Sequence, residues 1–274
     1  MHFVNGKPAS QISVTDRGLL YGQSIFETIA IAEQQPLLLE QHIERLKLGC
    51  DILSIPVDTN QIIEDILGVC DSLNNDTKVL RVMVTMGEGG RGYSNPGSPS
   101  SNCIISIYDY PEHPKSNWSE GVEVGVSDVR LASQPLLAGI KHSNRLEQVL
   151  AKSNWQTNWQ EAIMLDQSDN VIEATQSNIF VLKDKQLLTP DLSQSGVAGV
   201  MRDKILKQAI KIGVETKIMS LSVADIEAAQ EVFLSNSLIG LWPVKQLKSQ
   251  RYSGFKLCHT LLNILRENGA IPTN

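Results

Sequence analysis

The sequence lacks most of the patterns that would assign it to a specialised class of protein. Its four cysteines, Cys50, Cys70, Cys103 and Cys258, are scattered and form no CxxC pair, and its five histidines form no HExxH pattern. We therefore expect neither a zinc site nor a disulfide framework, and a reducing cytoplasm fits this cysteine usage. No apolar run approaches the roughly 18 residues of a membrane span. The first ten residues contain no apolar core of a signal peptide.

An excess of positive charge is also missing. The 274 residues carry a formal net charge of −6, which gives no support for nucleic-acid binding. The chain is 42% hydrophobic and 20% charged, an ordinary composition for a soluble protein. Its length suffices for one large domain or two medium ones. We find no internal repeat and no low-complexity segment.

Hydrophobic periodicity predicts a mixture of helices and strands. We expect helices at 39–53, 59–73, 201–212, 223–229 and 256–267, and strands at 24–31, 78–86, 102–110, 122–131, 162–166, 171–174, 178–182, 186–189 and 231–235. Residues 2–6 and 11–14 read as a hairpin around NGKP. Because strands and helices do not alternate strictly, two α+β domains are favoured over a doubly wound sheet. We place them at 1–112 and 121–274, with a proline-containing linker at 113–120.

The stretch LLAGIKHSNRLEQVLAKSNW is centred on Lys141. Ser143 is a plausible N-cap for a helix that follows. The apolar face of that helix would hold Leu146, Val149 and Leu150. Lys141 would then lie where buried backbone meets a helix N-terminus, and both burial and the helix dipole favour a neutral, nucleophilic amine there. The alternative is a surface lysine on the first turn of a helix.

Three further features could serve the same chemistry. Glu173 lies in the otherwise apolar strand VIEA, where a carboxylate needs a partner: a protonated ring nitrogen, a nearby arginine, or solvent at a sheet edge. The segment GVAGVMR, residues 196–202, places glycines before a helix, which suits a phosphate or simply a turn. Arg45 lies on a helix, and a solvated arginine is the alternative there. Together, a lysine, a phosphate cradle and a ring-nitrogen partner are what pyridoxal phosphate requires of a protein.

These motifs make the sequence resemble the fold-type IV pyridoxal-phosphate enzymes, and among them most closely the 4-amino-4-deoxychorismate lyases. The matching segments include VTDRGLLYGQSIFET, EQHIERL, GEGGRGYS, LAGIKHSNRLEQVL, VIEATQSNIF, GVAGVMR and SNSLIGLWPV. The resemblance implies an α+β fold of the D-amino-acid aminotransferase type, with two domains and a cofactor cleft between them. It also implies a homodimer in which loops of the partner help to close the site.

The resemblance assigns roles by position. Lys141 resembles the lysine that bonds to pyridoxal 5'-phosphate and acts as the general base, and Glu173 matches the carboxylate paired with the pyridine nitrogen. The remaining cofactor-binding candidates are Arg45, Val200, Met201, Asn236 and Ser237 at the phosphate, and Ser177 and Asn178 beside the ring. Arg91, Tyr93 and Thr28 are the substrate-binding candidates, although an ordinary loop or strand surface is the alternative for Tyr93 and Thr28.

Two positions depart from the relatives, and they bear on the reaction. Met201 stands where aminotransferases often have a threonine, and Met86 where many relatives have an arginine that holds a substrate carboxylate in D-amino-acid aminotransferases. The resemblance implies conversion of 4-amino-4-deoxychorismate to 4-aminobenzoate and pyruvate in folate synthesis. A D- or branched-chain amino-acid aminotransferase is the alternative enzyme, and a catalytically silent cofactor-binding relative is the non-enzymatic one.

Overall fold

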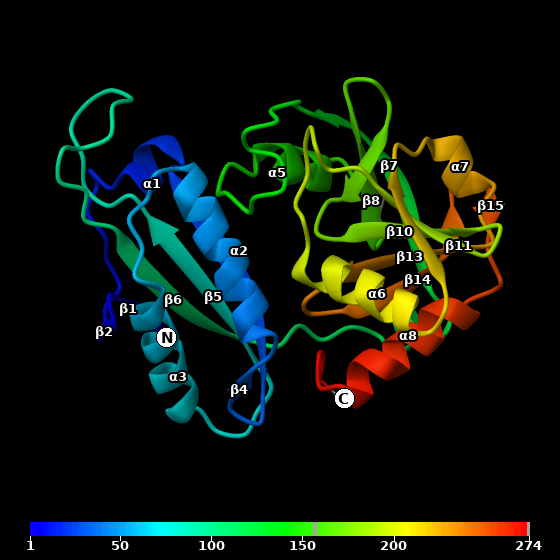
Figure 1. The fold of residues 1–274 in the computed structure, drawn as a ribbon, viewed down its shortest axis with the longest axis horizontal. Coiled ribbons are helices and arrows are strands. Elements are labelled where there is room, and N and C mark those ends of the chain that lie inside the picture. Colours follow the sequence, from blue (N-terminus) through cyan, green and yellow to red (C-terminus); the bar gives the residue numbers. More distant parts are fainter. Residues whose placement is uncertain (156–157, 273–274) are drawn as a thin grey trace. The chain divides into compact units, whose positions relative to one another are not determined.

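The computed structural model describes residues 1–155 and 158–272, and these form two compact units (Figure 1). Unit 1 contains residues 1–111, 140–144 and Pro272, whereas unit 2 contains residues 112–139 and 145–271. The predicted linker, 113–120, thus falls within unit 2. The segment around Lys141 groups with unit 1, although it lies in the C-terminal half of the sequence. No helix in the described part of the chain is both long and apolar enough to cross a membrane.

Unit 1 is an antiparallel sheet with its two long helices on one face. Its strands are β1 (His2–Val4), β2 (Lys7–Pro8), β3 (Ser24–Ala32), β4 (Gln35–Pro36), β5 (Lys78–Thr85) and β6 (Asn102–Asp109), in the order β2-β1-β6-β5-β3-β4. Its helices are α1 (Arg17–Tyr21), α2 (Leu39–Ile52) and α3 (Thr59–Asp71). The hairpin partner of β1 is β2, so the predicted pairing with residues 11–14 was wrong. A two-residue turn at Asn5 and Gly6, both at positive φ, closes this hairpin.

The alternation of side chains along β3 decides which face each residue occupies. Ile25, Glu27 and Ile29 point to the face that α2 covers, and a Cβ at Gly49 of α2 would lie only 2.7 Å from Ile25. Phe26 and Thr28, one position out of phase, point to the opposite face. The β3–β5 register places Arg81 on that opposite face, directly across from Thr28.

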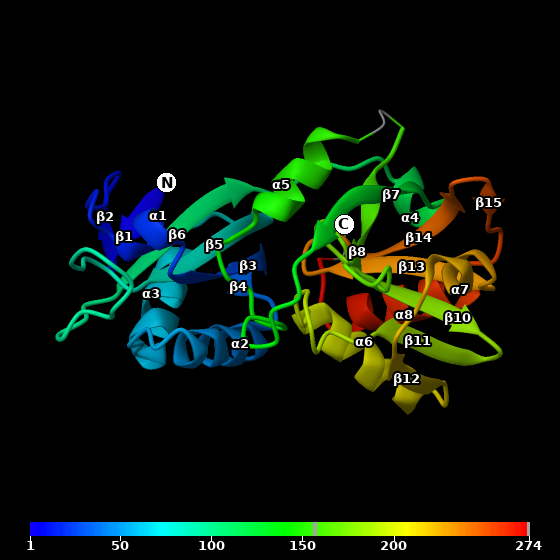
Figure 2. The ribbon, with the colours of Figure 1, turned by 90° about the horizontal axis from the view of Figure 1, so that it is seen from above.

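Unit 2 is built on a nine-stranded mixed sheet (Figure 2). Its strands are β7 (Val122–Leu131), β8 (Glu161–Asp166), β9 (Val171–Ala174), β10 (Asn178–Lys183), β11 (Gln186–Pro190), β12 (Glu215–Met219), β13 (Glu231–Asn236), β14 (Gly240–Leu247) and β15 (Gln250–Arg251). The order is β12-β11-β10-β13-β14-β7-β8-β9, with β15 paired to β14. The helices are α4 (Ser116–Ser119), α5 (Leu146–Ser153), α6 (Val200–Lys211), α7 (Val223–Glu227) and α8 (Lys256–Glu267).

Helices α6 and α8 pack on one face of this sheet, against β13. Phe180 and Phe233 stack on this face with ring centroids 5.1 Å apart. The buried carboxylate of Glu231 accepts hydrogen bonds from the backbone N–H groups of Leu257 and Cys258, so it holds the first turn of α8. A carboxylate at a helix start is stabilised by these N–H groups and by the helix dipole.

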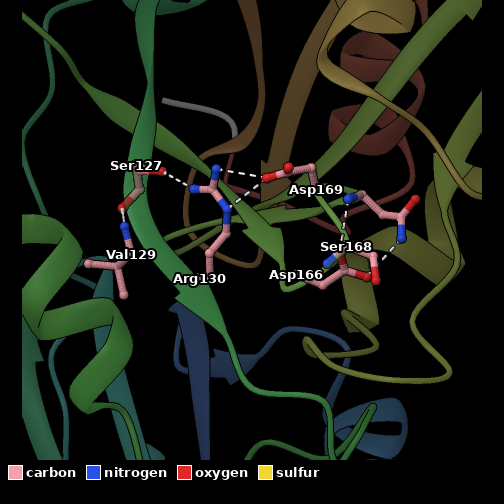
Figure 3. A network of polar contacts seen from close by, with 7 residues as sticks. Ser127, Val129, Arg130, Asp166, Ser168 and Asp169 are labelled. Carbon is pink, nitrogen blue, oxygen red and sulfur yellow. Dashed lines mark hydrogen bonds and ion pairs between the residues drawn. The ribbon is translucent and has the colours of Figure 1, made fainter.

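A bulge in β7 is held by a polar network (Figure 3). The Arg130 guanidinium pairs with Asp169 at 2.8 Å and donates to the Ser127 carbonyl at 2.9 Å. Asp166, at the end of β8, accepts from the Ser168 N–H at 2.8 Å and closes the turn that carries Asp169. The network ties the irregular part of β7 to the β8–β9 turn.

Most of the predicted elements are confirmed within a residue or two. The predicted helix 256–267 matches α8, and the four predicted strands after residue 161 match β8, β9, β10 and β11. The sequence reading missed α1, α4, β4, β12, β14 and β15. β14 reads GLWPVKQL, and its central proline argues against a strand.

Candidate active site

Lys141 belongs to an extended segment that pairs with β3 of unit 1. Its carbonyl accepts a hydrogen bond from the Phe26 N–H at 2.9 Å, and the Ser143 N–H donates to the Ser24 carbonyl at 3.1 Å. His142 forms an antiparallel bridge with Ile25 between these two bonds. The backbone on both sides of the lysine is therefore fixed by strand pairing, and Nζ lies 4.5 Å from the centre of the Phe26 ring.

The predicted helix start at Ser143 was wrong. Helix α5 begins at Leu146 with Arg145 at its N-cap, and no side chain caps it. The Ser143 hydroxyl instead accepts a hydrogen bond from Ser24 Oγ at 2.6 Å. The pairing with β3 competes successfully with helix formation here, so Lys141 lies outside the first turn, where the helix dipole acts.

The apolar face of α5 was expected to be buried, and this expectation was wrong. The side chains predicted to form its apolar face are largely exposed, at 76% for Leu146, 57% for Val149 and 56% for Leu150. The helix is amphipathic, as its sequence predicts, but the apolar stripe is not covered by the chain itself.

Arg45 of α2 is anchored on a buried carboxylate. Its Nε donates to Glu27 Oε1 at 2.7 Å and its Nη2 donates to Oε2, while His42 Nδ1 lies 2.6 Å from the same Oε2. Glu27 is fully buried. Burial pushes the pKa of Glu27 upward, but the charge and hydrogen bonds of Arg45, with those of His42, outweigh it and lower this pKa to about 2. The guanidinium is thereby held in one orientation at the surface of α2.

In unit 2, Glu173 faces the loop that leads into α6. It is 5% exposed on β9, and its Oε2 accepts the Val197 N–H at 2.8 Å. Gly196 has φ +86°, and a Cβ there would lie 2.7 Å from Ile172 and 3.3 Å from Glu173 Oε2. Glycine is needed both for the backbone conformation and for the close packing of this loop on β9.

The start of α6 is an uncapped helix N-terminus. Gly199 is the N-cap and supplies no side-chain acceptor, so the first-turn N–H groups keep their capacity to bind an anion. Asn178 stands beside it: a Cβ at Gly199 would lie 2.0 Å from Asn178 Oδ1, and Asn178 Nδ2 donates to the Val197 carbonyl at 2.9 Å. Val200 and Met201 follow with buried side chains. The role that the resemblance implies for them would rest on backbone groups, which a methionine supplies as well as a threonine does.

Ser177 and Asn236 form one hydrogen-bonded chain with a residue that sequence reasoning missed, Glu161. Asn236 Nδ2 donates to Ser177 Oγ at 3.2 Å, and Ser177 Oγ donates to Glu161 Oε1 at 2.9 Å. Thr175 donates to the other oxygen of this buried carboxylate. Burial raises the pKa of Glu161, and the two hydroxyl bonds only partly offset it. A glutamate opening the apolar strand EAIMLD was the available signal. Ser237 directly follows β13 and is partly buried.

The substrate-side candidates lie in unit 1. Arg91 and Tyr93 are exposed in the loop 87–101, and Tyr93 packs edge-on against Tyr21. Arg17, which is 2% exposed, holds this loop by donating to the carbonyls of Gly92 at 3.0 Å and Tyr93 at 3.3 Å. The loop is therefore anchored at its centre. Thr28 is partly buried on the face of β3 where the Lys141 segment also presents its Nζ.

The residues present fit pyridoxal phosphate in chemical terms. The uncapped start of α6 suits its phosphate, and the buried, hydrogen-bonded Glu173 suits a protonated ring nitrogen. Both features lie in unit 2, and Gly196 and Gly199 bring them onto one loop. Unit 1 contains Lys141 and the fixed guanidinium of Arg45. Among the described residues, no group of three or more His, Cys, Asp or Glu is placed to hold a metal ion.

Comparison with known proteins agrees with this chemistry. Residues 24–247 match the model of the family described as amino-transferase class IV. An aminodeoxychorismate lyase of Vibrio harveyi is 36% identical over 91% of this chain and 92% of its own length. A putative branched-chain-amino-acid aminotransferase of Methanocaldococcus jannaschii is 33% identical over 89% and 85%. The crystal structure of 4-amino-4-deoxychorismate lyase from Pseudomonas aeruginosa superimposes with a TM-score of 0.95 at 42% identity, covering 98% of this chain and all of that one. The chain belongs to the class IV aminotransferase family, with the fold-type IV architecture of these pyridoxal-phosphate enzymes.

Proposed function

We propose that this protein is a pyridoxal-phosphate-dependent lyase that converts 4-amino-4-deoxychorismate to 4-aminobenzoate and pyruvate, a step of folate synthesis. The observation that carries the proposal is the likeness, over nearly the full length of both chains, to the lyase from Pseudomonas aeruginosa at 42% identity and a TM-score of 0.95. The lysine, the glutamate and the uncapped helix start that the chemistry needs are all present in this chain.

The proposed roles are those that the resemblance assigns residue by residue. Lys141 and Arg45 would serve the cofactor, and Thr28, Arg91 and Tyr93 the substrate. The remaining cofactor-binding candidates are Glu173, Ser177, Asn178, Val200, Met201, Asn236 and Ser237. The backbone amides at Val200 and Met201, with Arg45 and Ser237, would bind the phosphate, and Glu173 would keep a proton on the ring nitrogen.

When bound, the cofactor supplies an electron sink for the carbanion that forms at the substrate carbon bearing the amine. Lys141 Nζ would take the proton from that carbon, C4, as general base. The C3–O bond would then break and release enolpyruvate, which takes up one proton on its methylene carbon to become pyruvate. Loss of the C4 proton and of the C3 oxygen makes the ring aromatic, which supplies much of the driving force. Strand pairing on both sides of Lys141 restricts the amine to the reach of its own side chain, which favours a positioned proton transfer.

A branched-chain or D-amino-acid aminotransferase is the second candidate, and the 33% identical relative named as a putative branched-chain-amino-acid aminotransferase favours the branched-chain option. It would use the same lysine and cofactor. The Met86 side chain is fully buried, so this position presents no cation to a substrate carboxylate. That observation weighs against the D-amino-acid option.

The test is a coupled assay with chorismate, glutamine and the amidotransferase that makes aminodeoxychorismate. Wild type is expected to produce equal amounts of 4-aminobenzoate and pyruvate, and a Lys141→Ala variant none above background. Lys152→Ala, which removes a lysine of α5, serves as the matched control and should retain activity. A yellow, cofactor-loaded wild type that forms neither product refutes the lyase, and amino-acid/keto-acid pairs then test the second candidate.

We also propose that the protein is a homodimer. The exposed apolar stripe of α5, Leu146, Val149 and Leu150, supports this proposal because a second copy could bury it. Light scattering after size exclusion should give twice the mass of the 30.2 kDa chain for wild type, and a smaller mass for a Leu146→Glu, Leu150→Glu variant. Ile210→Glu, which alters an equally exposed apolar residue of α6, should leave the mass unchanged. A monomeric wild type contradicts the proposal.

A cytoplasmic location is part of the same proposal. All four cysteines are free thiols rather than disulfides, as expected for a reducing compartment. Fractionation of cells that express the protein at its native level tests this location.

A further inference from the structure

Gly139, two residues before Lys141, is bonded to the loop that leads into α6. Its N–H donates to the Gly196 carbonyl at 2.9 Å, and its carbonyl accepts the Ala198 N–H at 2.9 Å. These two bonds make a parallel bridge between Gly139 and Val197. Both backbone polar groups of Gly139 are therefore used by this one loop, and we call the pair of bonds the Gly139 clamp.

The two peptide groups on either side of Val197 connect this clamp to the candidate cofactor residues. The peptide group between residues 196 and 197 accepts from Gly139 and donates to Glu173 Oε2 at 2.8 Å. The next peptide group accepts from Asn178 Nδ2 at 2.9 Å and donates to the Gly139 carbonyl. Hydrogen bonds that run through one peptide group polarise and strengthen one another. Glu173 and Gly139 are thus held by the same short stretch of backbone.

Little backbone remains free between the clamp and Lys141. The Lys141 carbonyl accepts the Phe26 N–H at 2.9 Å, and Ile140, which is 1% exposed, is the one residue in between. Two residues of extended chain span at most about 7 Å. The backbone angles at Gly139 therefore set the direction in which the chain leaves the α6 loop, and with it the point from which the lysine side chain starts.

The conformation of Gly139 is one that other residues rarely adopt. Its φ is +84°, in the region that favours glycine. Beyond its chain neighbours, a Cβ there would meet one atom of the described residues within 4 Å, the Cβ of Ala198 at an ordinary 3.8 Å. Glycine is therefore required at this position for its backbone angle and not for lack of space, so a substitution acts on the backbone direction without a clash.

We propose that Gly139 is a positioning residue for Lys141, and that its clamp and its positive φ direct the lysine amine toward the cofactor. The inference deepens the proposed function and rests on it for the role of Lys141. Lys141 Nζ would bond the aldehyde carbon of pyridoxal phosphate with loss of water, whereas other groups hold the phosphate and the ring nitrogen. A change at Gly139 should therefore disturb the bond to the lysine and spare the other two interactions.

The experiment compares the full-length wild type with Gly139→Ala and Gly139→Asn. Gly213→Ala is the matched control, because Gly213 has φ +79° and open space around its Cβ in the turn after α6. Titrations give the Kd of pyridoxal phosphate and of 4'-deoxypyridoxine 5'-phosphate, which keeps the phosphate and the ring nitrogen but has a methyl group in place of the aldehyde. The absorbance of bound pyridoxal phosphate is followed against pH. Borohydride reduction with peptide mass spectrometry identifies the bonded lysine, and thermal melting shows that each variant is folded.

We expect Gly139→Ala to bind pyridoxal phosphate about 10-fold more weakly, the factor that corresponds to the strain of a non-glycine residue at positive φ. The deoxy analogue should bind within about twofold of wild type, because it forms no bond to the lysine. The absorbance transition should move by at least about half a pH unit. Gly139→Asn should fall between, since asparagine tolerates positive φ better than alanine does. Gly213→Ala should lose thermal stability but keep both affinities and the absorbance transition.

Equal weakening of both ligands in Gly139→Ala refutes the inference, because the change would then act on the loop. So does an unchanged affinity and absorbance transition for pyridoxal phosphate, or the same loss in Gly213→Ala. If Gly139→Ala does not fold, Gly139→Asn decides by the same criteria. Reduction that labels another lysine of the wild type overturns both the role of Lys141 and the inference. A labelled Lys141 without lyase activity refutes the proposed reaction, while the two titrations still decide the role of Gly139.

Discussion

Two fully buried glutamates, one in each unit, are expected to respond to the same substitution in opposite ways. Glu27 is surrounded by Arg45 and His42, whereas Glu161 has the hydroxyls of Thr175 and Ser177. Burial disfavours both carboxylates. At Glu27 the nearby charges and hydrogen bonds outweigh the effect of burial, and the pKa falls to about 2. At Glu161 the effect of burial is the larger one, and the pKa is raised.

The magnitude for Glu27 follows from its pKa. A fall from 4.5 to about 2 on folding corresponds to roughly 3 kcal/mol of stability at neutral pH. Because the folded pKa is the lower one, this contribution is complete above about pH 4.5 and is lost as the pH falls toward 2. Glu27→Gln should therefore lower the free energy of unfolding at pH 7 and flatten its dependence on pH in the acid range.

Glu161 has the opposite sign. Because its folded pKa lies above the ordinary value, the protonated form favours the folded state, and stability is lost as the pH rises through the raised pKa. Glu161→Gln resembles the protonated acid in shape and charge. Its stability relative to wild type should thus increase from acid toward neutral pH.

Urea unfolding at fixed protein and cofactor concentration, followed by circular dichroism at several pH values, measures both effects. Two results would contradict this expectation. One is a free energy of unfolding for Glu27→Gln that lies within about 1 kcal/mol of wild type at pH 7, because roughly 3 kcal/mol is expected. The other is a Glu161→Gln variant that loses as much stability as Glu27→Gln. Activity is a separate readout, because Glu161 also orients Ser177 and Asn236.

Three further predictions concern the loops and the cofactor. Gly199→Ala would place a Cβ 2.0 Å from Asn178 Oδ1. Titration with pyridoxal phosphate should therefore show at least about tenfold weaker binding, a loss of about 1.4 kcal/mol of binding free energy. Gly68→Ala is the control and should bind the cofactor normally, because the space around its Cβ is open. Glu173→Gln keeps an acceptor for Val197 but cannot hold a proton on the ring nitrogen, and kcat should fall by about 100-fold or more, measured with cofactor saturating; near-normal turnover would contradict the assigned role. Arg17→Gln removes the donors to the carbonyls of Gly92 and Tyr93. Proteolytic cleavage between residues 87 and 101 should therefore accelerate, and the free energy of unfolding should drop by about 2 kcal/mol. Unchanged cleavage would show that other contacts hold the loop.

Local patterns in the sequence determined most of the regular elements. The 3.6-residue period and the β-branched runs predicted α8 and the strands of unit 2, because an amphipathic helix or a buried strand leaves its period in the sequence. The elements that were missed lack that signal. α1 has five residues, and β14 is a strand only because β7 and β13 flank it.

Residue types and the family resemblance identified the candidate residues. Their surroundings depend on contacts between residues that are far apart in the sequence, which a local sequence pattern does not contain. Lys141 joins β3, more than a hundred residues earlier, and this pairing replaced the helix start that the local sequence favoured. Glu161 gains its place beside Ser177 through burial on β8.

The charge state and contacts of individual side chains likewise depend on which residues lie beside them in the folded protein. A sequence shows that Arg45 and Arg81 are both arginines on regular elements, but only the tertiary structure pairs the first with Glu27 and places the second over the Phe26 ring. It also leaves the apolar stripe of α5 uncovered within the chain. The physical reason is that periodicity is a property of neighbours along the chain, whereas charge pairing and burial depend on residues that folding brings together from a distance.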